Sequence, residues 1–146
     1  MDSISQQDKK GNTNIKVLPF LKSSKQALLL AIIWTIVILL LTGLPGNSFP
    51  KVSKWMDVLQ PDKFVHLGMF FPFVLLWQSY FFYKNMSATK SIVIVGVFGI
   101  LYAILTEVLQ HYVFIGRNAN YPDAIADVIG VILGLIIFNI VRSRIV

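Results

Sequence analysis

Four long apolar stretches alternate with short polar segments along the chain. Each stretch is long enough for one continuous helix, and we predict helices over residues 26–43, 62–83, 91–113 and 123–141. A helix rises about 1.5 Å per residue, so about 20 apolar residues cross the hydrocarbon core of a membrane. The pattern therefore predicts an all-α integral membrane bundle of four transmembrane helices.

The composition supports the same class of protein. Hydrophobic residues make up 55% of the chain and charged residues only 14%, which would leave a soluble domain too little polar surface. The net charge of +6 comes mainly from lysines beside the apolar stretches, so we expect anionic membrane lipids, and not nucleic acid, as the counter-charge. The absence of cysteine excludes disulfides and thiolate chemistry.

The polar segments predict the domain organisation. Residues 1–25 are polar and basic, so we expect a flexible N-terminal tail ahead of one membrane domain over 26–143. After the first helix, the apolar residues within 55–59 are expected to form a short helix along the membrane surface.

The positions of lysine and arginine predict the orientation. Nine of the 13 lie in the two terminal segments or between the second and third helices, and the other four lie at the opposite end. Cytoplasmic segments carry an excess of these residues. We therefore expect both termini in the cytoplasm and the loops 44–61 and 114–122 outside.

Polar side chains gather near one end of the predicted helices. Those in or beside the last turns at the outer end are Asp62, His66, Glu107, Gln110, His111, Asp123 and Asp127. A charge at membrane depth costs about 2.5–3.5 kcal/mol on insertion scales, so it persists where it is paired, hydrated or used. We predict an outward-facing polar pocket among the last three helices, with Arg117 of the loop as a counter-charge.

Small residues predict how two of these helices pack. Gly130 and Gly134 share one face of the fourth helix, and a comparable line of small residues covers 96–103 of the third. Small residues let transmembrane helices approach closely. We expect the third and fourth helices to pack through these lines, which would bring Glu107 near Asp127.

The candidate roles follow from side-chain chemistry. The candidate catalytic residues are His66, Glu107, Asp123 and Asp127, and the candidate substrate-binding residues are Asp62, Lys63, Gln110 and Arg117. An imidazole beside a carboxylate can act as an acid–base pair. One His with two or three carboxylates can also hold a divalent cation, but no tight spacing such as His-Glu-x-x-His is present, so the sequence assigns no metal or cofactor.

Structural roles are open for the same residues. Asp62 and Asp123 stand at helix starts, where a carboxylate caps free backbone N–H groups. His66 could be a buried hydrogen-bonding residue, and Glu107 could form a purely structural pair with Arg117.

Two segments resemble a known family. The segment 61–70, Pro-Asp-Lys-Phe-Val-His-Leu-Gly-Met-Phe, resembles the Asp-Lys-x-x-His-x-x-x-Phe segment of the VanZ-like membrane proteins. The segment 106–110, followed by Arg117, Asp123 and Gly130, resembles their second signature. Asp127 departs from the pattern, which has Asn at this place, and adds a negative charge.

The resemblance implies a small multi-pass protein of the bacterial cytoplasmic (inner) membrane that affects sensitivity to teicoplanin. This acylated glycopeptide acts on cell-wall precursors outside that membrane. We therefore expect the polar pocket to bind or modify a lipid-linked or amphipathic envelope molecule, with lipids or a glycopeptide as ligands. Enzymatic activity and oligomeric state are left open. The alternative is a non-enzymatic assembly or interaction protein whose polar residues only lock the helices together.

Overall fold

The computed structural model describes residues 18, 21–44, 61–114 and 121–145. The predicted interfacial helix at 55–59, Arg117 and most of the predicted tail lie outside these ranges. The described residues form four long helices: α1 (Ser24–Gly43), α3 (Pro61–Tyr83), α4 (Ala88–Tyr112) and α5 (Tyr121–Ile145).

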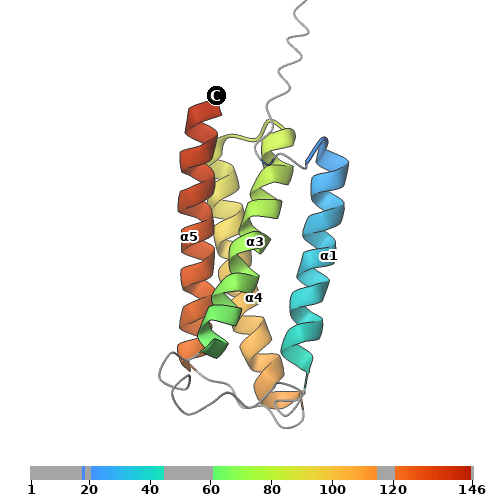
Figure 1. The fold of residues 1–146 in the computed structure, drawn as a ribbon, viewed down its shortest axis with the longest axis vertical. Helices are drawn as coiled ribbons and strands as arrows, with labels where there is room; N and C mark the ends of the chain where they lie inside the picture. Colours follow the sequence, from blue (N-terminus) through green and yellow to red (C-terminus); the bar gives the residue numbers. More distant parts are fainter. Residues whose placement is uncertain (1–17, 19–20, 45–60, 115–120, 146) are drawn as a thin grey trace, which may run out of the picture.

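The four helices stand side by side, with α1 and α4 running opposite to α3 and α5 (Figure 1). The start of α1 and the end of α5 therefore lie at the same end of the bundle. Each helix is long and apolar enough to cross a membrane. The prediction of an all-α, four-helix, multi-pass membrane protein is confirmed.

α5 continues to Ile145, beyond the predicted end at residue 141. Arg142 accounts for the extension, because its guanidinium donates a hydrogen bond to the carbonyl oxygen of Met86 at 2.8 Å. The same group lies over the ring of Phe82, 5.4 Å from its centroid. These contacts hold the last turns of α5 against the connection between α3 and α4.

The bundle also includes the last residues of the predicted tail. Leu21 is completely buried and packs in a cluster with Ala27 and Leu76. Its carbonyl oxygen accepts a hydrogen bond from the hydroxyl of Tyr83 at 2.8 Å. The side chain of Ser23 caps the first turn of α1. Residues 21–25, ahead of the predicted helix start, thus take part in the packing of the bundle.

Aromatic rings fill the middle of the bundle. Phe73 of α3 stacks on Tyr102 of α4, with ring centroids 5.5 Å apart and planes 15° apart. The indole N–H of Trp34 donates to the carbonyl oxygen of Met69 at 2.8 Å, and the Tyr102 hydroxyl donates to that of Thr35 at 2.6 Å. Lipid chains are as apolar as the helix surfaces, so close packing and such hydrogen bonds hold transmembrane helices together.

The glycines of α5 face α3, not α4 as predicted. A methyl group built on Gly134 would lie 2.7 Å from Cβ of Val74, and one built on Gly130 would lie 2.8 Å from the carbonyl oxygen of Leu67. Both distances are below 3.0 Å, and real Cβ atoms essentially never approach other heavy atoms so closely. Glycine at these positions therefore permits the close approach of α3 and α5.

The glycines of α4 meet larger side chains of α5. A methyl group built on Gly99 would lie 2.9 Å from a methyl carbon of Val131. A methyl group built on Gly96 would lie 3.3 Å from a methyl carbon of Leu135. The predicted mutual packing of two small-residue lines is therefore wrong. The face of α5 that carries Gly130 and Gly134 packs on α3. The adjacent face, with the branched side chains of Val131 and Leu135, packs on α4.

The contact at Gly134 gives a stability prediction. Gly134→Ala should lower the free energy of unfolding by about 1–3 kcal/mol, because overpacking forces α3 and α5 apart. The measurement is the midpoint of thermal unfolding of the purified protein in detergent.

Gly68→Ala is the matched control, because a methyl group there meets no atom within 4 Å. Its midpoint should stay unchanged or rise slightly, since Ala is the better helix former. Equal losses in both variants would contradict this account of the α3–α5 contact.

Candidate functional site

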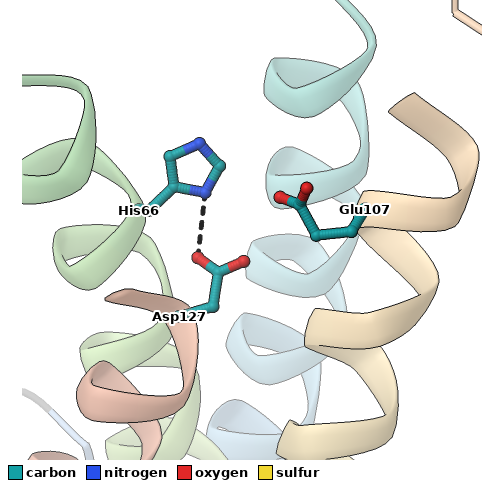
Figure 2. A group of neighbouring side chains, drawn as sticks. All are labelled: His66, Glu107 and Asp127. Atoms are coloured by element: carbon teal, nitrogen blue, oxygen red, sulfur yellow. Dashed lines mark hydrogen bonds and ion pairs between the residues drawn. The ribbon is translucent and has the colours of Figure 1, made fainter. Parts of the chain in front are cut away.

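Ionisable side chains from three helices meet at the end of the bundle where α3 and α5 begin and α4 ends, which is the lower end in Figure 1. His66 comes from α3, Glu107 from α4 and Asp127 from α5 (Figure 2). One ligand atom from each of the three lies within 4.8 Å of the others, and all three residues are buried. The predicted meeting of these residues is confirmed.

His66 and Asp127 form the closest polar contact of this group. Nδ1 of His66 lies 3.0 Å from Oδ1 of Asp127, so the imidazole donates to the carboxylate when Nδ1 carries the proton. His66 is 5% exposed and Asp127 is 0% exposed. A hydrogen bond in such surroundings is shielded from water and fixes the orientation of the ring.

The second oxygen of Asp127 is in a different position. Oδ2 is buried and has no hydrogen-bond partner among the described residues. In Figure 2 it points to the side where Glu107 lies. Buried polar atoms are nearly always hydrogen-bonded, so an unpartnered carboxylate oxygen requires an explanation.

Lys63 and Asp123 extend the group toward the start of α3. The Lys63 ammonium lies 3.3 Å from Oδ2 of Asp62 and 3.5 Å from Oδ1 of Asp123. Nε2 of His66 lies 3.9 Å from Oδ2 of Asp123, on the side of the ring away from Asp127. We call Lys63, His66, Glu107, Asp123 and Asp127 the charged cluster.

The other predicted site residues lie outside the charged cluster. Asp62 is exposed, and its carboxylate lies 3.3 Å from the Lys63 ammonium. Gln110 is buried, and its amide nitrogen lies 3.4 Å from the carbonyl oxygen of Thr42, which ties α4 to α1. His111 is exposed beside Tyr112. Arg117 lies outside the described residues.

Burial of the charged cluster costs free energy, because its charged groups lose their contact with water. Removing an ionised carboxylate from water costs several kcal/mol even after the protein relaxes. Asp127 is fully buried, and the ion-pair partner that the described residues offer it is His66. Oδ2 of Asp127 has no hydrogen-bond partner among the described residues, so this position suits a proton or a cation.

A groove beside the charged cluster was missed by sequence reasoning. It has a volume of about 270 Å³ and is lined by Lys63, Phe64, Leu67, Pro122, Ile125, Ala126 and Ile129. We call it the α3–α5 groove. In the sequence, the apolar residues of the groove look like ordinary lipid-facing positions. The feature that could have indicated the groove is Lys63, which stands next to them at a helix start.

Comparison with known proteins gives one finding. The comparisons with curated proteins and with solved structures gave no match. The model of one protein family, described as VanZ/LLP1, matches residues 3–142. That range covers nearly the whole chain and every residue of the charged cluster. The chain is therefore a member of the VanZ/LLP1 family of membrane proteins.

Proposed function

We propose that this protein binds or modifies a lipid-linked or amphipathic envelope molecule with an anionic headgroup. The observation that carries the proposal is the position of Lys63, which lines the apolar α3–α5 groove and also forms an ion pair with Asp123 of the charged cluster. One side chain thus joins a surface suited to a hydrocarbon chain to a group suited to polar recognition.

The groove supports the apolar half of this ligand. Ile125 and Ile129 of α5 stand one turn apart and line it with Phe64 of α3. A hydrocarbon chain in such a groove exchanges lipid contacts for protein contacts at little cost and holds its headgroup near the helix ends. The occupant proposed here is one acyl or isoprenoid chain of a membrane lipid.

The charged cluster supports the polar half. The Lys63 ammonium can attract a phosphate or carboxylate as a point charge. Nε2 of His66 lies on the same side, while Asp127 holds the opposite ring nitrogen. An imidazole oriented in this way by a carboxylate can move a proton to or from a bound headgroup, which is the step that a modifying enzyme would need.

The charge distribution supports an outward-facing site. Six of the seven lysines and arginines among the described residues lie toward the end of the bundle opposite the charged cluster, and cytoplasmic segments carry such an excess. An outward site at a bacterial inner membrane would meet envelope lipids and acylated glycopeptides such as teicoplanin. The effect on teicoplanin sensitivity that the VanZ-like resemblance implies belongs to this proposal.

The first test is the phenotype of cluster variants. His66→Ala and Glu107→Gln should lower teicoplanin tolerance of the expressing cells toward the level of cells without the protein, because each removes one polar arm of the site. Tolerance is measured as the minimal inhibitory concentration at matched protein levels in the membrane.

His111→Ala is the matched control, because this imidazole is exposed at the end of α4 and lies outside the charged cluster. It should leave tolerance unchanged. Full tolerance in the His66 and Glu107 variants at normal expression would disprove the proposal.

The second test concerns the groove. Ile125 is 58% exposed, so Ile125→Trp can fill the groove without entering the core. It should reduce binding of a radiolabelled or photoactivatable anionic lipid by roughly tenfold, equivalent to about 1.4 kcal/mol. Leu105→Trp, on the exposed face of α4 away from the groove, should bind like the unsubstituted protein.

A structural role for the cluster is the competing function. The His66–Asp127 hydrogen bond joins α3 to α5 in the interior of the bundle. This contact favours a structural role, in which the cluster only fixes the position of one helix against the other. If the role is only structural, each variant that loses teicoplanin tolerance should also lose folded protein.

The third test separates these roles by thermal unfolding in detergent. Single substitutions of His66 and Asp127 by Ala should each lower the free energy of unfolding by about 3–5 kcal/mol, because the remaining partner stays buried and unpaired. The double variant should cost less than the sum of the two. Glu107→Gln leaves the His66–Asp127 hydrogen bond in place, so it should stay folded yet lose the phenotype. If teicoplanin tolerance instead falls in step with the unfolding midpoint in all variants, the role of the charged cluster is structural.

A further inference from the structure

The charged cluster has the donor set of a metal site. One imidazole and two carboxylates, from His66, Glu107 and Asp127, each place a ligand atom within 4.8 Å of the other two. The three residues come from three different helices and converge on one region, as Figure 2 shows. Imidazole suits Zn²⁺ and carboxylates suit Mn²⁺, so this mixed set can hold a divalent ion of either kind.

An independent observation points to a ligand at this place. Oδ2 of Asp127 is buried without a hydrogen-bond partner among the described residues, although the residue is 0% exposed. The atom lies on the side of Glu107, within the region that the three side chains surround (Figure 2). A carboxylate oxygen in this position lacks the contact that buried polar atoms require, and a cation would supply it.

We propose that His66, Glu107 and Asp127 bind one divalent cation of the Zn²⁺ or Mn²⁺ class. Nδ1 of His66 and Oδ1 of Asp127 are 3.0 Å apart. Two adjacent ligands are separated by about 3.0–3.4 Å, from octahedral to tetrahedral geometry, when each bond to the metal is about 2.1 Å. The cation would replace the proton between these two atoms and bind both oxygens of Asp127, which gives Oδ2 the contact it lacks. A rotation of the longer Glu107 side chain would complete the set.

The charge and coordination of the cation fit the surroundings. Its positive charge offsets the desolvation cost of the Asp127 carboxylate, which is 0% exposed. Three protein ligands leave coordination positions open for water or for an oxygen of a ligand. That the open position receives the phosphate of an envelope lipid rests on the proposed function, whereas binding of the cation itself does not.

The test uses the full chain purified in detergent and treated with chelator. Titration with MnCl₂, followed through the electron paramagnetic resonance signal of free Mn²⁺, should show one ion bound per chain. Asp127→Asn and Glu107→Gln should each weaken binding by at least roughly tenfold, since substitutions around metal ligands have effects of that size. Retained helical circular dichroism confirms that each variant is folded.

His111→Ala is the control for adventitious imidazole binding and should bind Mn²⁺ like the unsubstituted protein. Stoichiometric binding that both carboxylate variants lose and the control keeps supports the site. Absence of stoichiometric binding, or equal binding in all variants, overturns it.

Failure of this inference and failure of the proposed function give different results. If the protein binds no Mn²⁺ while the His66 and Glu107 variants lose teicoplanin tolerance, the cation site is wrong and the proposed function stands. If Mn²⁺ binds as expected while these variants keep full tolerance, the cation site stands and the proposed function is wrong.

Discussion

The cost of placing a carboxylate inside an apolar bundle is the constraint on which the rest of this structure depends. Asp127 is fully buried in a helix that is otherwise almost entirely apolar through the membrane. It is tolerated because His66 of α3 reaches it at 3.0 Å. A buried charge that loses its partner costs several kcal/mol, so the position of α3 relative to α5 is tied to this pair.

The close approach of α3 and α5 places the functional features together. Gly130 and Gly134 remove the side chains that would separate the helices, and Leu67 and Val74 of α3 take the space. The same approach sets His66 beside Asp127 and forms the groove in which Lys63 lies. Small residues one and two turns along from an acidic residue thus position both the charged cluster and the groove that it borders.

Much of the architecture was predictable because membrane spans obey a simple rule. Every backbone polar group must be satisfied within lipid, so a long apolar stretch forms a helix whatever its neighbours are. The ends were less predictable, since they depend on contacts such as that of Arg142 with Met86. The meeting of His66, Glu107 and Asp127 was predictable from the cost of isolated charges, but the helix that packs on the glycines of α5 was not.

The sequence by itself determined the class of protein, the number of spans and the residues that must find polar partners, because these follow from hydrophobicity along one dimension. The tertiary structure decided which partner each residue found. Gln110 donates a hydrogen bond to the carbonyl oxygen of Thr42 in α1. Lys63 forms an ion pair with Asp123 of the charged cluster and also lines the α3–α5 groove. Helical periodicity shows which residues share a face, but the rotation of each helix about its axis depends on how the faces of all four fit together.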